Sequence, residues 1–372
     1  MPDTSSCSGC RSVADEPGGR RPRILHIIPH DGVGGVEVAA RSMAERTDLD
    51  CDFTLLLLAG KTLSEAPTRI EESPFGAPLN PLAQWRGIAR CVRNPPDVLI
   101  MSLWRSVGVA VLARLIRRRI RLVFFLNLER PVHAVDAIAS RIAIAFADEV
   151  WADSAATLQA RIGKRRKATR VISFVTQRRE APATAPAAAP RFVTWSRLNR
   201  QKGIDRALHF IAALAERGID ASFDIWGPDD GEQASLEVLA RELGIEERVH
   251  FRGAAERDSL SQVAADASFF LQLSRYEGMA MGTVEAMQLG LVPVVTPVGE
   301  MARYVENGGS GVFVDPDDLR AGVEAVAELI SRPEAYARTR NGAIAYWQNA
   351  ALYAEDVCAA SHALLAGGED KG

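Results

Sequence analysis

The stretch RILHIIPHDGVGGVEVAARSMAER, residues 23–46, indicates how the first half of the chain folds. Its apolar run 23–28 breaks into the glycine-rich segment 31–35, after which apolar residues recur at helical spacing as far as Arg46. A short apolar run, a tight turn and a helix form the repeating unit of a parallel sheet that helices cover on both faces. The stretch therefore predicts the first strand and helix of an α/β domain.

The same unit recurs outward from this stretch. Further apolar runs that we interpret as strands lie at residues 51–58, 96–103, 121–126 and 149–153. Helical patterns follow two of these runs, and their alternation predicts a doubly wound domain over residues 21–176. Residues 1–20 are polar and lack apolar spacing, so we expect a disordered leader there.

A second domain of the same kind is predicted after a linker. Residues 177–190, QRREAPATAPAAAP, are rich in alanine and proline and have no periodicity, which is typical of a linker. Strands and helices alternate again over residues 191–345, and residues 346–372 are predicted to form a C-terminal helix that packs back towards the N-terminal domain. Two such domains in tandem place the carboxyl ends of two sheets across a cleft, where ligands usually bind.

The composition is that of an ordinary globular protein, with 47% hydrophobic and 24% charged residues. No apolar run is long enough for a membrane-spanning helix, and the first twenty residues have no apolar core of a secretion signal, so we expect a cytoplasmic protein. Five cysteines, at 7, 10, 51, 91 and 358, fit a reducing compartment better than a disulfide framework. We interpret the Cys7-x-x-Cys10 spacing as coincidence, because no second ligand pair lies near it.

Charge divides the chain into a basic and an acidic half. Residues 1–180 contain 27 Lys and Arg against 19 Asp and Glu, whereas residues 181–372 contain 17 against 28. The basic half is expected to meet an anionic substrate or surface. Four arginines fall at helical spacing, namely Arg114, Arg117, Arg118 and Arg121. Together with the basic run 164–167 they could lie on anionic lipid. The alternative is a solvated basic surface. No nucleic acid is expected, because the basic runs lack interleaved aromatic residues.

Two loops at predicted strand ends could hold phosphate. In the first, Gly32, Gly34 and Gly35 would let backbone amides approach a phosphate at the start of a helix, although a tight turn without ligand is the alternative. A dehydrogenase fingerprint would need glycine where Glu37 stands, so that class is excluded. In the second, SRLNRQKG, Arg197 and Lys202 could clamp a diphosphate, or they could be ordinary surface charges.

The segment EGMAMGTVEAM, residues 277–287, is the most informative. Its glycines predict exposed amides where the chain enters a helix, facing phosphate or sugar oxygens. Glu285, near the start of that helix, could accept two hydrogen bonds from a vicinal diol such as ribose, and Glu277 would face another part of the same ligand. The alternative interpretation is that neither glutamate binds a ligand, one being an ordinary acidic residue at a helix N-terminus and the other a surface residue.

The pattern E-x₇-E in this segment, preceded by SRLNRQKG and followed by LGLVPVVTPVGE and SGVFVDPDD, resembles the second domain of the retaining family-4 glycosyltransferases of GT-B fold. VHFRG, DIWGPDDG and the N-terminal GGVE resemble further motifs of that family, and the resemblance covers residues 22–366. It implies the GT-B fold class, two doubly wound Rossmann-like domains that face each other across a cleft.

The resemblance also implies roles for individual residues. The catalytic residues would be Arg197 and Lys202, which hold the donor diphosphate, and Glu277, which holds the donor sugar. Glu285 would bind the ribose hydroxyls. The other implied donor-binding residues are Gly34, Gly35, Arg252, Gly253, Gly278, Met279, Ala280 and Met281. No metal and no cofactor are implied beside the nucleoside-diphosphate sugar, and we interpret Asp315-Pro-Asp317 as helix-start residues rather than metal ligands.

The chain departs from the family pattern at two places. A histidine often follows the fourth strand in the family, and Ser102 of MSLWR stands at that position here. His133 and Glu129 could replace it, while Trp104 and Arg105 could shape the acceptor side. In VGEMARYV, residues 298–305, Glu300 and Arg303 stand where the family tends to have a second glycine and a later glutamate.

The expected activity is therefore transfer of a sugar from a nucleoside-diphosphate donor, with retention, to a hydroxyl acceptor such as a sugar, glycolipid or polysaccharide. The enzyme would act in the synthesis of polysaccharide, glycolipid or another glycoconjugate, in the cytoplasm, with possible peripheral contact to an anionic membrane at its inner face. Two alternatives stay open, another GT-B reaction such as sugar epimerisation and a nucleotide-sugar-binding protein without turnover.

Overall fold

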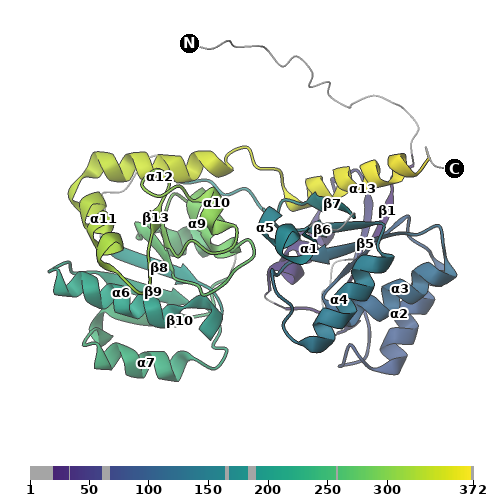
Figure 1. The fold of residues 1–372 in the computed structure, drawn as a ribbon, viewed down its shortest axis with the longest axis horizontal. Helices are drawn as coiled ribbons and strands as arrows, with labels where there is room; N and C mark the ends of the chain where they lie inside the picture. The colour runs from purple at the N-terminus through teal and green to yellow at the C-terminus, as the bar shows by residue number, and fades with distance from the viewer. Residues whose placement is uncertain are drawn as a thin grey trace, which may run out of the picture.

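The computed structural model describes residues 20–32, 34–60, 68–163, 167–182, 190–256 and 259–369. Two α/β bodies stand next to each other, each built on a parallel sheet (Figure 1). The predicted leader up to residue 19, with Cys7 and Cys10, lies outside the described residues, as do residues 164–166 and most of the predicted linker. The prediction of two doubly wound domains is confirmed.

The first sheet has seven parallel strands in the order β3-β2-β1-β4-β5-β6-β7. They are β1 (Arg23–His30), β2 (Asp52–Ala59), β3 (Ile70–Glu72), β4 (Val98–Ser102), β5 (Arg121–Leu126), β6 (Glu149–Ala152) and β7 (Ala168–Val171). Ile24 of β1 pairs with Phe53 on one side and with Val98 on the other. The strand order reverses between β1 and β4, so the loops that follow these two strands flank the crevice where open α/β sheets bind ligands.

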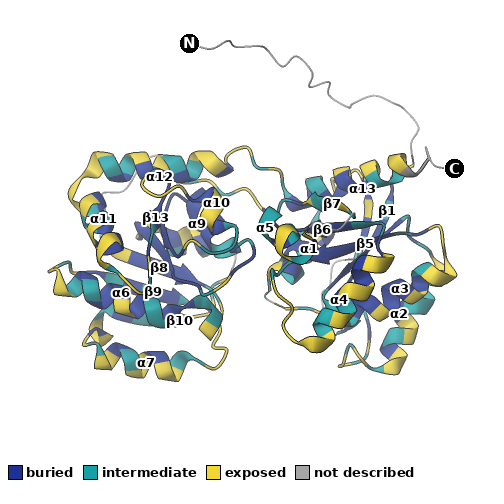
Figure 2. Ribbon diagram, viewed as in Figure 1, coloured by how far each residue is buried: buried dark blue, intermediate teal, exposed yellow. Residues whose placement is uncertain are grey.

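Helices cover both faces of the first sheet. One face carries α1 (Gly35–Glu45) and α13 (Tyr353–Glu369), and the other carries α2 (Pro81–Arg93), α3 (Val107–Ile116) and α4 (Ala134–Phe146). The short η1 (Trp104–Ser106) precedes α3, and α5 (Ala155–Arg161) follows β6. Because both faces are covered, the five inner strands β2, β1, β4, β5 and β6 are buried almost throughout, as Figure 2 shows, which explains their continuous apolar runs.

The second sheet has six parallel strands in the order β10-β9-β8-β11-β12-β13. They are β8 (Arg191–Trp195), β9 (Ser222–Trp226), β10 (Val249–Gly253), β11 (Phe269–Gln272), β12 (Val292–Val295) and β13 (Val312–Phe313). Around them lie η2 (Arg200–Lys202), α6 (Ile204–Glu216), α7 (Gln233–Glu242), η3 (Glu246–Arg248), α8 (Leu260–Ala265), α9 (Met281–Gln288), α10 (Met301–Tyr304), α11 (Arg320–Ser331) and α12 (Pro333–Trp347). Phe192 stacks on Phe269 in the core, with ring centroids 5.0 Å apart.

The helix α13 returns to the first body (Figure 1). Its Tyr353 lies in the core between that sheet and α1, with its ring 5.5 Å from that of Phe174. The backbone N–H of Ser173 donates to Asp356 at 2.7 Å, which fixes the helix at its start. The first body is thus built from two segments of chain that are far apart in the sequence.

A disulfide joins Cys51, just before β2, to Cys358 of α13, with Cα atoms 5.9 Å apart. The prediction that the cysteines form no disulfide is therefore wrong for this pair. The two residues are 307 positions apart, so nothing in their spacing indicated that α13 brings them together. Cys91 is a buried free thiol, whose pKa burial raises to about 12.

The predicted basic helix face is also corrected. α3 ends at Ile116, Arg117 adopts a non-helical conformation, and Arg121 already belongs to β5. Arg114 and Arg121 both point to Asp148, at 3.8 Å each. The four arginines therefore do not share one helix face, because the helix ends inside the run that was counted as helical.

Candidate functional site

The glycine-rich segment 277–287 comprises the end of the loop that follows β11 and most of α9, so the chain enters a helix there as its sequence pattern indicates. Ala280, immediately before α9, has φ of 56°, and Leu103, after β4, has φ of 62°. These are the two non-glycine residues with positive φ among the described residues. Such conformations are strained and cluster at functional sites. Leu103 directly follows β4 in the first body, and Ala280 ends the loop between β11 and α9 in the second body.

Glu277 is buried and surrounded by donors. Its Oε1 accepts hydrogen bonds from Lys202 Nζ at 2.7 Å, from Ser274 Oγ at 2.8 Å and from Gln272 Nε2 at 2.9 Å. Gly203 makes the Lys202 contact possible, because with φ of 64° it approaches the carbonyl of Leu273 so closely that any Cβ would overlap it. Two predicted catalytic residues are thus brought into direct contact.

Glu285 is buried at the other end of the same segment. Trp195 Nε1, at the end of β8, donates to its Oε2 at 3.1 Å, and a guanidinium nitrogen of Arg179 lies 3.8 Å from its Oε1. The carboxylate is therefore oriented by an indole and charge-compensated by a cation. Neither Trp195 nor Arg179 was predicted from the sequence, although a tryptophan that ends a buried strand is a recognisable signal.

The remaining predicted donor-binding residues of the second body lie along one sheet edge. Arg197 is half exposed and 3.5 Å from Asp230. Arg252 Nε donates to Asp224 on the neighbouring strand at 2.6 Å, while the Gly253 carbonyl accepts from Gly227 N–H at 2.7 Å. At this edge of the second sheet, each of the two arginines thus lies beside a carboxylate, Arg197 beside Asp230 and Arg252 beside Asp224.

The glycine loop of the first body meets this edge from across the cleft. Gly35 begins α1 and lies against Phe174 and Met281; a Cβ at Gly35 would be 3.9 Å from Met281 Cγ. Gly34 lies against the carboxylate of Glu37. Burial raises the pKa of Glu37, and the charge of Arg197 partly opposes that shift. Gly35 is thus brought against Met281, and Glu37 beside Gly34 is near enough to Arg197 for their charges to interact.

Asp153 is a buried carboxyl group that the sequence reasoning missed. It follows β6 and contacts Gly278 so closely that a Cβ there would lie 2.6 Å from Oδ2, and its Oδ1 has no hydrogen-bond partner among the described residues. Burial raises its pKa to about 7, an effect that hydrogen bonds from Thr157, Ser154 and the Met279 backbone partly offset. Its position, directly after a buried strand in EVWAD, was the available signal.

Glu300 makes a second contact between the bodies. Its Oε2 accepts from the Ala156 backbone at the start of α5, and its own N–H donates to the Gly278 carbonyl at 3.0 Å. The departure from the family pattern at this position therefore coincides with a link between the two bodies.

Ser102, at the position of the family histidine, is fully buried and lies 2.8 Å from His26 Nε2. Burial lowers the pKa of His26 to about 3, so this imidazole is neutral. The Ser102 hydroxyl is thus engaged inside the first body.

Trp104 and His133 come together at the same sheet edge, with ring centroids 5.2 Å apart, and Arg105 lies 4.9 Å from the Trp104 ring centroid. His133 caps α4 by accepting from Asp136 N–H at 3.1 Å. The predicted roles of Trp104, Arg105, His133 and Glu129 stay predictions.

No group of three or more potential metal ligands occurs among the described residues. Asp315 accepts from the Asp317 backbone in a turn after β13. No helix in the described part of the chain is long and apolar enough to cross a membrane.

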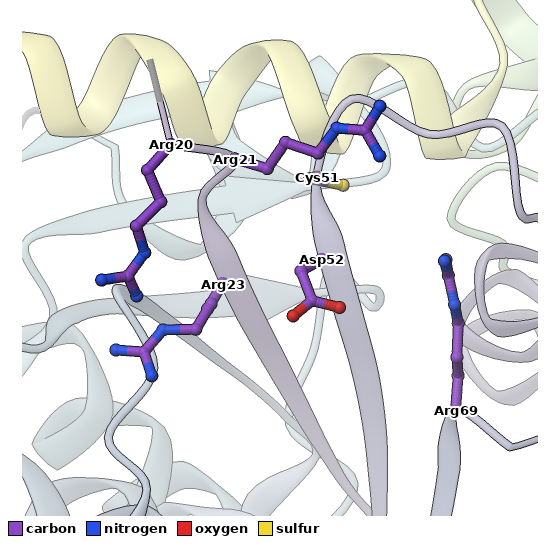
Figure 3. Close-up of a pocket in the computed structure, with 6 residues that line it drawn as sticks. All are labelled: Arg20, Arg21, Arg23, Cys51, Asp52 and Arg69. Atoms are coloured by element: carbon purple, nitrogen blue, oxygen red, sulfur yellow. The ribbon is translucent and has the colours of Figure 1, made fainter. Parts of the chain in front are cut away.

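A cavity of about 410 Å³ lies at the opposite edge of the first sheet, where its strands begin (Figure 3). Arg20, Arg21, Arg23 and Arg69 surround it, with Cys51 and Asp52. Arg20 and Arg23 are 3.5 and 3.6 Å from Asp97. The cavity contains none of the predicted site residues.

One family model and several curated proteins match this chain. Residues 177–346 match the family model described as Glycosyl transferases group 1. A GDP-mannose:cellobiosyl-diphosphopolyprenol alpha-mannosyltransferase of Komagataeibacter xylinus is 26% identical over 339 residues, which are 82% of this chain and 84% of that protein. A lipopolysaccharide core biosynthesis mannosyltransferase of Rhizobium meliloti is 30% identical over 178 residues, 45% of this chain and 49% of that protein.

Among solved structures, Anabaena HepE in complex with UDP and glucose superimposes with a TM-score of 0.75 at 22% identity, over 95% of this chain and 100% of that one. The Thermosynechococcus elongatus sucrose-phosphate synthase superimposes with a TM-score of 0.71 at 18% identity, over 94% and 99%. These likenesses show the fold.

The fold and the matches define a glycosyltransferase of GT-B fold. It takes its sugar from a nucleotide-sugar donor and acts in glycoconjugate synthesis, and residues 177–346 are its group 1 glycosyltransferase region.

Proposed function

We propose that this chain is a retaining glycosyltransferase of family 4 that moves a hexose from a nucleoside diphosphate to a hydroxyl of a glycolipid or polysaccharide acceptor. The observation that carries the proposal is the buried contact of Lys202 with Glu277 next to the start of α9, opposite the Gly34–Gly35 loop. A cation and a carboxylate beside the positive end of a helix support a site for an anionic ligand.

Each element has a role in this proposal. Arg197, Lys202 and the amides at the start of α9 stabilise the negative charge that develops on the departing diphosphate, which is the main source of catalysis. Glu277 accepts hydrogen bonds from hydroxyl groups of the donor sugar, and Glu285, oriented by Trp195, accepts hydrogen bonds from the ribose hydroxyls. The departing diphosphate takes up the proton that the acceptor hydroxyl loses, so no residue need act as a general base, and the proposed reaction uses neither a metal nor a cofactor.

The domain boundaries form part of the proposal: an acceptor-side domain over residues 21–176, a linker over 177–190, a donor domain over 191–345 and a C-terminal helix over 346–372. The site of action is proposed to be the inner face of the membrane, on the cytoplasmic side. A disulfide is rare in that compartment, so cell fractionation with thiol labelling of Cys51 and Cys358 is a direct check of the location.

The relatives suggest which donors to test first, because one is named for GDP-mannose and another was solved with UDP and glucose. Thermal-shift measurements with GDP-mannose, UDP-glucose and their free nucleotides should identify the donor. Incubation with that donor and a diphosphopolyprenol-linked sugar should then give a product whose new anomeric centre has the configuration of the donor by NMR.

Other outcomes would contradict the proposal in different ways. An inverted product would refute retention. Binding of the donor without product would favour a binding protein, and release of an epimerised sugar nucleotide would favour an epimerase.

A further inference from the structure

Three neighbouring helices of the first body expose apolar side chains to solvent. α2, α3 and α4 cover one face of the first sheet (Figure 1), and each has a second apolar stripe on its outer side. Eleven of the fifteen exposed large hydrophobic side chains of the described residues belong to these helices or directly precede them. They are Leu79, Leu82, Trp85, Leu112, Leu115, Ile116, Val132, Val135, Ile138, Ile142 and Phe146, and we call them the α2–α4 surface.

The stripes have helical spacing, so they are presented outward as sets. In α3, Leu112, Leu115 and Ile116 are at positions i, i+3 and i+4, while residues such as Ala110 and Ala113 face the sheet and are fully buried. Figure 2 shows the exposed residues of α4 alternating with buried ones. A helix with apolar side chains on both its inner and outer sides indicates a second partner besides the sheet.

The other helices do not share this property. Among the described residues, α1 and α13, on the opposite face of the same sheet, contribute no exposed large hydrophobic side chain. In the second body such side chains are isolated, at Val238, Tyr276 and Tyr346. The apolar exposure is therefore concentrated on one side of one body rather than spread over the molecule.

The charge around this surface is positive. Residues 79–148 contain eleven arginines and four acidic residues, of which Asp148 lies 3.8 Å from both Arg114 and Arg121. Within α2, α3 and α4 the one acidic residue is Asp136, and its carboxylate accepts from the Val132 backbone and from Ser140 Oγ. Arg117, Arg118 and Arg119 are exposed directly after Ile116, and Arg141 is exposed within α4.

We propose that the α2–α4 surface docks on a membrane that contains anionic lipid. Apolar side chains would enter the boundary between headgroups and acyl chains, while the flanking arginines would extend to lipid phosphates. Two copies of this chain packed through the same surface would bring arginines together without facing carboxylates, which disfavours a second copy as the partner. The positive charge of the α2–α4 surface thus complements an anionic lipid layer, whereas it would repel the same surface of a second copy.

The docking surface also has a defined relation to the cleft. α4 begins next to His133, which contacts Trp104 at the carboxyl edge of the first sheet. A membrane under α4 would therefore lie beside the acceptor side of the site. If the chain acts as proposed above, this arrangement would bring the hydroxyl of a lipid-linked acceptor to the cleft while the lipid stays in the membrane.

The test is co-sedimentation of the full chain with vesicles of phosphatidylcholine alone or mixed with phosphatidylglycerol. Binding to the mixed vesicles should be at least about tenfold stronger and should fall at high salt. Leu115→Ser/Ile138→Ser and Arg118→Glu/Arg119→Glu should each weaken it by about tenfold or more. The matched controls, Val171→Ser/Val238→Ser and Arg241→Glu/Arg338→Glu, change equally exposed residues elsewhere and should stay within about twofold of wild type.

Donor binding, measured by calorimetry, should be unchanged in all four variants and shows that they are folded. Equal sedimentation of wild type and Leu115→Ser/Ile138→Ser would overturn the proposal. So would a dimer in lipid-free sedimentation velocity that this variant dissociates, because the partner would then be a second copy. Vesicle binding without sugar transfer would refute the proposed function and leave the docking surface intact.

Discussion

The amino group of Lys202 lies 2.7 Å from Oε1 of Glu277, and this contact joins the loop after β8 to the turn after β11. Their side chains are 17% and 5% exposed, so the pair is largely out of water. Removing one member of a buried ion pair leaves the other charge uncompensated, which costs more than removing both. A loss of activity after mutation of either residue can therefore come from the fold as well as from the chemistry.

A double-mutant cycle separates the two effects. Lys202→Met should lower the free energy of unfolding by ~3 kcal/mol, and Lys202→Met/Glu277→Gln should lower it less, because the neutral amide no longer needs a cation. Urea denaturation of these two variants and of the single variant Glu277→Gln, with Arg200→Met on the exposed side of η2 as control, completes the cycle. If the losses of unfolding free energy in the two single variants add up to the loss in the double variant, the two charges do not stabilise each other.

Glu285→Gln should weaken binding of the donor and of the free nucleoside diphosphate alike, by ~1–3 kcal/mol, because a hydrogen bond to a charged group is replaced by a neutral one. The amide oxygen can still accept from Trp195, but the buried Arg179 loses a charged partner, so urea denaturation of the variant is measured beside binding. Calorimetry with both ligands is the measurement, and Glu216→Gln, on the exposed side of α6, is the control. Unchanged affinity for the nucleotide would remove Glu285 from the binding site.

Arg197→Ala should lower kcat by roughly 10²–10³, the scale of a lost donor to a developing negative charge. Arg197 is half exposed, so its loss should hardly affect stability, unlike that of Lys202. Steady-state kinetics beside Arg200→Ala, an exposed neighbour, tests this. The wild type should keep full activity in EDTA, whereas a strict requirement for Mg²⁺ or Mn²⁺ would contradict the metal-free mechanism.

Asp153 should make stability depend on pH. Burial raises its pKa from 3.8 to about 7, so the folded protein binds the proton more tightly than the unfolded chain does. The stabilisation is complete below pH ~4 and is lost as pH rises through ~7. Over that window, the free energy of unfolding of the wild type should fall relative to Asp153→Asn by up to about 1.4 kcal/mol per pH unit.

Denaturation curves from pH 4 to 8 test this prediction about Asp153, with Asp317→Asn in an exposed turn as control. If wild type and Asp153→Asn show the same pH profile, the carboxyl group is ionised throughout and the raised pKa is refuted.

The fold was predictable because its signals are local. Buried parallel strands read as continuous apolar runs, and LLLL at residues 55–58 lies inside β2 as expected. The candidate site residues were predictable for a related reason. In parallel sheets every strand end lies at the same edge, so residues just after a strand, such as Arg197 and Glu277, are expected to converge.

Contacts between distant segments were not predictable in this way. The Lys202–Glu277 pair spans 75 positions, and the Cys51–Cys358 disulfide spans 307. The outer stripes of α3 and α4 were hidden for another reason. A helix with apolar residues on two sides gives the same sequence signal as a fully buried helix, and only the packing shows which side lies against the sheet.

The return of α13 to the first body has a consequence for the order in which the protein folds during synthesis. Buried residues of α13, among them Tyr353 and Val357, complete a core whose other buried residues come from the first half of the chain. When the ribosome adds them, every strand of the second sheet, together with α11 and α12, has already been synthesised. Domains generally fold as units as they leave the ribosome. The second body can therefore finish first, while the first waits, with the surface under α13 uncovered, for the last helix.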